Sequence, residues 1–185
     1  MSANDDNLRP TTMIGPILCF VIGLVLLIVS GWLVLTDRIL LTPANVTESD
    51  LTTFNQRFEF CCQWWTLIGV WLVLNIFVVI GCRFVSWKYL LEPLSGSTDA
   101  IDLSNAILRN SMEQALIYIL LQLTMLPKLS PSIAIKLIPF INLIWFLGRI
   151  GFTVGYPRFR GLGNAMSFPL LLPMTVYAIY LNVLK

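Results

Sequence analysis

The sequence contains no histidine and few charged residues of either sign. Only 12% of its 185 residues are Asp, Glu, Lys or Arg, whereas a soluble domain carries about 25%. Without histidine, the chain lacks the commonest general base near neutral pH and the commonest metal ligand. A net charge of +2 argues against a phosphate-binding surface and therefore against a nucleic-acid partner. With 57% hydrophobic residues, the composition predicts an integral membrane protein whose first partner is membrane lipid.

Cysteines are also few, and their spacing does not suggest a metal site. The four are Cys19, Cys61, Cys62 and Cys82, with no CxxC pair among them. Cys19 and Cys82 lie in apolar runs, where a free cysteine behaves as a small hydrophobic residue. Two interpretations stay open for Cys61 and Cys62, which are core packing or a lumenal disulfide.

What the sequence does contain is long hydrophobic runs. A helix needs roughly 20 apolar residues to cross a bilayer, and five runs approach that length. The pattern predicts an all-α, polytopic membrane protein with five transmembrane helices. The expected segments are a tail at 1–12, spans at 13–35, 64–85, 106–126, 133–155 and 165–184, and a loop at 36–63 with a short helix near Ser49 or Asp50.

A glycosylation sequon gives the expected orientation. Asn45, Val46 and Thr47 form N-x-T, and its use requires a loop in the secretory lumen. Basic residues near the span ends do not decide the question, although they allow the same answer. We therefore expect a cytosolic N-terminus, a lumenal C-terminus and glycosylation at Asn45.

Two ionisable residues, Glu113 and Arg149, lie well inside predicted spans. Such residues are costly in lipid and tend to face protein or water. Both fall about two turns, or roughly 10 Å, from the cytosolic side of adjacent antiparallel helices. We expect them to meet, shielded from lipid. Three interpretations stay open, which are an ion pair that fixes helix register, a ligand pocket, and a proton or ion path.

Other polar residues follow helical spacing around this pair. Arg109 precedes Glu113 by four residues, and a polar edge continues toward the lumen. Further positive charge is expected at the cytosolic mouth. The pattern predicts a cation-rich pocket with one carboxylate, open to the cytosolic leaflet, which suits a small anion with an amino group. The additional residues of this pattern are Asp102, Gln114, Tyr118, Gln122, Arg158 and Arg160.

Two motifs resemble the MAPEG superfamily of membrane proteins of eicosanoid and glutathione metabolism. "RNSME", residues 109–113, resembles the R-N-x-x-E stretch of that family's second helix. "GRIGFTVGY", residues 148–156, resembles the third-helix stretch, in which a tyrosine follows an arginine by seven residues. The resemblance covers 64–185 and implies a MAPEG-like four-helix bundle, with 13–35 as an additional N-terminal transmembrane helix. "RFRGLG" and "FPLL" in the C-terminal region are similar to the mattrin-like branch.

The resemblance implies a site, a cofactor and an assembly. Asn110, Glu113, Arg149 and Tyr156 match residues that bind glutathione in active members, and Arg109 belongs to the same motif. Arg160 is the nearest match to an arginine that assists the thiolate. Active members are homotrimers that act on lipophilic electrophiles, and they carry an arginine where this chain has Ala106.

Two function classes follow from the resemblance. The mattrin-like branch implies a membrane protein of the endoplasmic reticulum, Golgi or endolysosomal system that acts by binding or regulation. The wider superfamily implies a glutathione-dependent transferase or peroxidase. Whether the chain is an enzyme stays open, although Ala106 favours the first class.

Overall fold

The computed structural model describes residues 14–39, 41, 46–85, 99–155 and 160–184. This part of the chain is 89% helical and contains no strand, which confirms the all-α prediction. Its elements are α1 (Ile14–Leu35), η1 (Glu48–Leu51), α2 (Phe54–Phe84), α4 (Asp99–Met125), α5 (Pro131–Gly155), α6 (Arg160–Ile179) and η2 (Tyr180–Leu184).

Three of the described helical stretches are long and apolar enough to cross a membrane. They are Phe54–Phe84, Pro131–Gly155 and Asn164–Leu184, which indicates a membrane protein. In α1, the apolar stretch Phe20–Leu35 is shorter, and α4 is not among the three because polar residues interrupt it.

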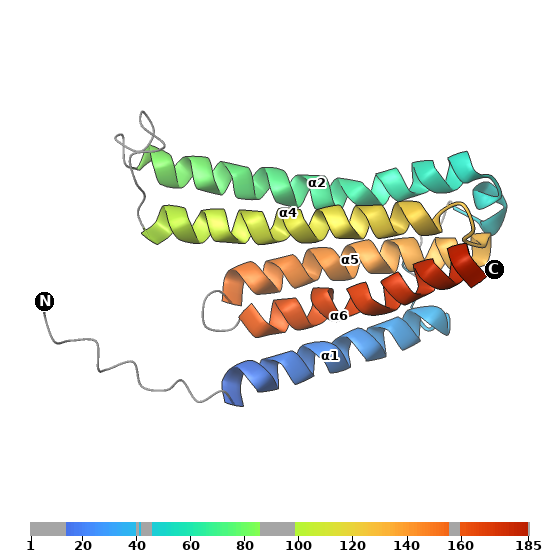
Figure 1. The fold of residues 1–185 in the computed structure, drawn as a ribbon, viewed down its shortest axis with the longest axis horizontal. Coiled ribbons are helices and arrows are strands. Elements are labelled where there is room, and N and C mark those ends of the chain that lie inside the picture. Colours follow the sequence, from blue (N-terminus) through green and yellow to red (C-terminus); the bar gives the residue numbers. More distant parts are fainter. Residues whose placement is uncertain (1–13, 40, 42–45, 86–98, 156–159, 185) are drawn as a thin grey trace, which may run out of the picture.

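The five long helices run side by side (Figure 1). α2 packs against α4 and α5, α6 packs against α5, and α1 packs on the outside against α6 and α5. At one end, α2 and α4 extend beyond α5 and α6 (Figure 1). The 27 residues of α4 span about 40 Å, more than the roughly 30 Å hydrocarbon core of a bilayer. α4 is therefore longer than a bilayer core is thick, and its first turns project past α5 and α6 (Figure 1).

Local capping sets where α2 begins. The hydroxyl of Thr53 accepts from the backbone N–H of Gln56, and Gln56 Oε1 accepts from the backbone N–H of Thr53 at 3.0 Å. This reciprocal capping box starts the helix at Phe54, ten residues before the predicted 64. Residues 54–63 of the expected loop are thus helical.

The remaining boundaries follow the hydrophobic runs with two further exceptions, of which one is α6, which begins at Arg160, five residues before the predicted 165. α1 and α5 match the predicted spans 13–35 and 133–155 to within two residues. α4 begins at Asp99, seven residues before the predicted 106. The short helix near Ser49 or Asp50 is present as η1, but Thr47 is its cap.

A buried arginine ties the elements together at the end where η1 lies. Arg57 of α2 is 8% exposed. Its guanidinium donates to the carbonyls of Leu51 and Thr52 at 3.0 Å and of Leu126 at 3.1 Å. The carbonyls at the end of α4 lack intrahelical partners, so one cation satisfies this helix end and the end of η1 together.

Candidate functional site: a buried polar cluster and a groove along α4

Arg149 of α5 lies at the centre of a buried polar cluster. Its guanidinium is fully buried and donates to Asn110 Oδ1 of α4 at 2.6 Å. On α6 it donates to Ser167 Oγ at 2.6 Å and to Asn164 Oδ1 at 3.3 Å. The ring of Phe152 lies 4.8 Å from its Cζ. Neutral oxygens from two neighbouring helices thus hold one cation in place.

The same cluster extends along α4. Ser167 Oγ donates to Gln114 Oε1 at 3.2 Å, and the Tyr118 hydroxyl donates to the carbonyl of Ser167. Asn110, Gln114 and Tyr118 recur at four-residue steps, so they lie on one face of α4. That face points into the bundle and fixes the rotation of α4 about its axis.

A second buried cluster surrounds Gln122, one turn beyond Tyr118. Its Oε1 accepts from Asn142 Nδ2 at 2.8 Å, Trp65 Nε1 at 3.2 Å and Cys61 Sγ at 3.3 Å. This joins α2, α4 and α5. Cys61, Cys62 and Cys82 are free thiols, so the alternative disulfide at Cys61 or Cys62 is not formed. Cys61 instead packs within this buried cluster.

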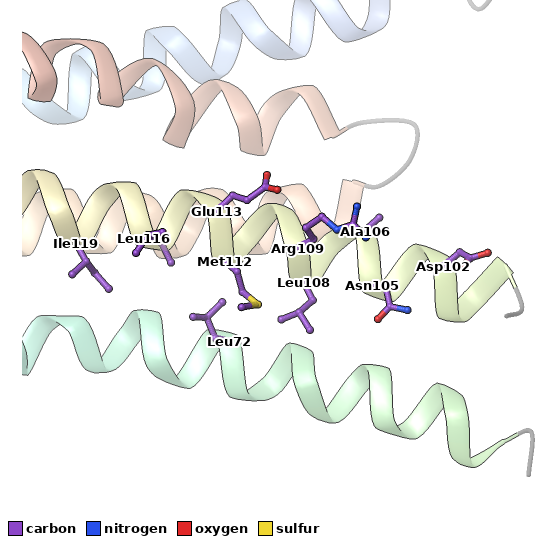
Figure 2. A pocket seen from close by; sticks show the side chains of 11 residues that line it. Leu72, Asp102, Asn105, Ala106, Leu108, Arg109, Met112, Glu113, Leu116 and Ile119 are labelled. Carbon is purple, nitrogen blue, oxygen red and sulfur yellow. The ribbon is translucent and has the colours of Figure 1, made fainter. Parts of the chain in front are cut away.

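Glu113 and Arg149 do not meet, contrary to our expectation. They lie at similar depth, because Asn110 is only one turn from Glu113 and contacts Arg149. However, Glu113 is exposed whereas Arg149 is buried. Figure 2 shows the carboxylate of Glu113 on the side of α4 away from α2. Residue spacing predicted the depth of Glu113 correctly, but it did not predict the face of α4 on which Glu113 lies.

Glu113 belongs instead to an open groove of about 980 Å³ along the outer face of α4. One end of the groove carries polar side chains, and the other end is apolar (Figure 2). Its polar lining is Asp102, Asn105, Arg109 and Glu113, and its apolar lining includes Leu72, Met112, Ala115, Leu116 and Ile119. Met112 and Leu116 are 53% and 61% exposed, so the groove opens directly to the surroundings of the bundle.

The charge of the groove differs from the predicted cation-rich pocket. Among the described lining residues, Arg109 is the one cation, while Asp102 and Glu113 supply two carboxylates. Arg149 is not in the groove lining and lies in the buried cluster instead. In the described part of the chain, the expected residues are therefore divided between a buried cationic cluster and an exposed groove whose described lining carries one excess negative charge.

The expected site residues fall into three groups. Asn110 and Arg149 are brought together, and Arg109 and Glu113 line the groove. Arg160 is the first residue of α6, but its side chain lies outside the described part of the structure. Tyr156, Arg158 and Asn45 also lie outside the described residues.

Two partners of Arg149 were missed from the sequence, namely Asn164 and Ser167. They are three residues apart on α6, and such spacing places both on one helix face. This pair of polar residues just after the glycines of "GLGNAMS" was the available signal. Buried polar groups need hydrogen-bond partners, so the pair should have suggested a polar partner on a neighbouring helix.

Comparison with known proteins adds no relative. No protein-family model, curated protein or solved structure matches this chain. What the chain is shown to be is therefore a helical membrane protein with a buried arginine cluster and a polar-to-apolar groove along α4.

Proposed function

We propose that this chain is a mattrin-like, multi-pass membrane protein of the secretory or endolysosomal system that acts by binding an amphipathic molecule in the α4 groove. One observation carries the proposal, which is the change from charged to apolar lining along a single helix. Asp102, Arg109 and Glu113 lie toward the start of α4, whereas Leu116 and Ile119 lie further along it.

The position of the groove relative to a bilayer supports this ligand class. If the end of α4 lies at one membrane boundary, about 20 of its residues fill the hydrocarbon core. Glu113 then lies roughly 10 Å below the opposite boundary. A charge that faces lipid costs about 2.5–3.5 kcal/mol on insertion scales at the centre of a spanning helix, and less nearer the boundary. A bound polar headgroup near Arg109 and Glu113, with its tail along Leu116, would remove this cost.

The buried cluster has a supporting role in this proposal. Arg149 holds Asn110 from inside the bundle, and Ser167 holds Gln114. Because these residues flank Glu113 in sequence, their bonds keep the Glu113 face of α4 turned outward. Arg149 is thus a positioning residue for the groove.

A glutathione-dependent transferase or peroxidase is the second candidate function. The motif Arg109, Asn110 and Glu113 supports it, since glutathione carries two carboxylates and one ammonium. Ala106 lines the groove at the position where active members carry an arginine. A missing cation weakens thiolate formation, and this favours binding over turnover.

The topology in this proposal has five spans, a cytosolic N-terminus and a lumenal C-terminus, with α1 and α4 as the two additional spans. The resemblance also supports a homotrimer. Glycosidase sensitivity tests the orientation, because Asn45 is glycosylated only if its loop enters the lumen. Thr47→Ala should abolish the glycan. If glycosylation occurs only at a sequon engineered into 86–98, then that segment is lumenal and the proposed orientation is reversed.

The binding proposal is tested by thermal unfolding in detergent with glutathione and with S-decylglutathione, which adds an alkyl tail. A ligand of the folded state raises the unfolding temperature, and we expect the larger, saturable rise with S-decylglutathione. Glu113→Gln should remove the rise, whereas Asp99→Asn, exposed at the start of α4 and outside the groove lining, should retain it. No rise at millimolar ligand, or an equal rise in Glu113→Gln, contradicts this site. Turnover of a lipophilic electrophile that is lost in Glu113→Gln would favour the second candidate.

A further inference from the structure

A second, separate cavity lies on the opposite side of the bundle, where α1 packs against α5 and α6. Its volume is about 360 Å³, and all but one of its lining residues are apolar or glycine. The exception is Lys136 of α5. We call this cavity the α1 slot. None of its lining residues belongs to the α4 groove.

The α1 slot is open to the outside of the bundle. Ile28, Trp32 and Leu35 form its outer wall and are 61%, 59% and 60% exposed. On the inner side, a Cβ at Gly31 would lie 3.3 Å from the Phe140 ring, so glycine permits close approach at the floor. An apolar cavity with an apolar exposed rim in a membrane protein is accessible to lipid chains.

The polar end of the slot carries both signs of charge. Lys136 Nζ lies 2.8 Å from each carboxylate oxygen of Asp37. The two side chains remain 25% and 55% exposed. An ammonium has three donors, and the two oxygens of Asp37 occupy at most two of them. Lys136 can therefore donate to a further polar group, and Asp37 can accept from one.

The ion pair has a fixed place at the end of the slot. Asp37 has φ 58, a left-handed conformation that commonly ends helices, and the next backbone N–H, that of Arg38, donates to the Leu33 carbonyl at 2.9 Å. From Leu27 to Leu35 the slot follows α1 for about 12 Å. Since α1 ends at Leu35 and α5 begins at Pro131, the ion pair lies at helix ends, where headgroups meet a bilayer core. Trp32 suits this boundary.

We infer that the α1 slot binds one acyl chain of a zwitterionic glycerophospholipid, with the phosphate at Lys136 and the headgroup ammonium at Asp37. Charge complementarity selects this occupant, because the phosphate is opposite in charge to Lys136 and the headgroup ammonium is opposite in charge to Asp37. A purely anionic headgroup or a fatty acid would satisfy Lys136 but would be repelled by Asp37.

Native mass spectrometry of the full chain, released from detergent after titration with phosphatidylethanolamine or phosphatidylglycerol, tests the inference. We expect saturable binding of one phosphatidylethanolamine per chain, in preference to phosphatidylglycerol. Ile28→Trp fills the slot from its exposed wall and should weaken binding about tenfold or more, or about 1.4 kcal/mol. Val29→Trp is the matched control, since Val29 is the exposed neighbour that does not line the slot.

Further variants separate the slot from general lipid contact. Leu35→Trp repeats the filling test if Ile28→Trp fails to elute as folded protein. Lys136→Met should weaken both lipids, whereas Asp37→Asn should shift the preference toward phosphatidylglycerol. Many weakly bound lipids that neither tryptophan variant reduces would show nonspecific lipid contact and overturn the inference. Preference of the wild-type chain for phosphatidylglycerol would overturn the assigned headgroup.

Discussion

Arg149 donates a 2.6 Å hydrogen bond to Asn110, while Glu113, one turn further along the same helix, is exposed on another face. The only basic residue deep in the α4–α5–α6 packing is thus held, among the described residues, by neutral oxygens. The carboxylate that could neutralise Arg149 lines the groove instead. In the proposed function, this separation keeps the carboxylate of Glu113 available for a ligand.

Replacing Arg149 tests what these neutral partners contribute. Arg149→Met leaves the oxygens of Asn110, Asn164 and Ser167 without their donor, and an unsatisfied buried polar group costs about 1–3 kcal/mol. We expect a net loss of that size in the free energy of unfolding, measured by detergent denaturation. Arg38→Met, at an exposed position after α1, should change it by less than about 0.5 kcal/mol. A gain in stability would mean that desolvation of the cation outweighs its hydrogen bonds.

Gln122 should be the most sensitive neutral polar residue of the core. Gln122→Leu removes the acceptor shared by Asn142, Trp65 and Cys61. Hydrogen bonds between membrane helices average about 0.6 kcal/mol and reach about 1.7, so we expect a loss of about 1–2 kcal/mol in the same unfolding assay. Thr124→Val is the control, because its hydroxyl bonds only to a carbonyl of its own helix. Equal effects of the two substitutions would contradict a special role for Gln122.

Periodicity and length in the sequence predicted helix positions and residue depth. They did not predict which helix faces pack inward, because three-dimensional packing decides that. The apolar runs defined α1 and α5 because bilayer-length hydrophobic stretches end at turn residues. The start of α2 was missed because polar and charged residues interrupt the apolar ones between Phe54 and Gln63, although Thr53 and Gln56 form a recognisable capping box. The depth of Glu113 followed from helical rise. Its outward face did not, since it depends on Asn110 and Gln114 turning inward to bond Arg149 of α5 and Ser167 of α6.

Arg57 should be essential for the end of the bundle that holds η1. Its fork satisfies carbonyls of Leu51, Thr52 and Leu126, a geometry that a lysine point charge cannot reproduce. We expect Arg57→Lys to lower the free energy of unfolding by about 1–3 kcal/mol. Hydrogen exchange should rise at 46–53 and at the end of α4, but not around Arg149. Unchanged exchange at 46–53 would contradict this role.

Cross-linking tests the proposed homotrimer. If a second copy covers the outer face of α4, then Met112→Cys should give dimers with a short bifunctional thiol reagent in membranes, and trimers with a trifunctional one. Met112 is 53% exposed on that face. Val78→Cys on α2, 55% exposed, has similar access and serves as the control. Equal yields from both positions would indicate random collisions.

Asp50 should titrate below the ordinary range. The backbone N–H of Thr47 donates to its carboxylate at 2.8 Å and the Thr47 hydroxyl at 2.7 Å, and these bonds lower the pKa of Asp50. A carboxyl whose pKa is lower in the folded state stabilises the fold at pH values above its unfolded pKa, near 3.8. This contribution to stability is lost as the pH falls through the folded-state pKa. Carbon-13 NMR titration of unglycosylated protein should show the pKa of Asp50 rising in Thr47→Val. Thr36→Val, whose hydroxyl contacts only its own helix, should leave it unchanged.

The peripheral place of α1 has a consequence for biogenesis. The clusters around Arg57, Gln122 and Arg149 draw their described members only from η1, α2, α4, α5, α6 and the turn after α4. α1 therefore contributes no described side chain to these three polar clusters, and in the proposed five-span topology we expect it to stay in the bilayer until α5 and α6 are inserted. We expect its docking, fastened by Asp37 and Lys136, to be the last step of assembly, so that a chain lacking α1 should still fold into the four-helix unit.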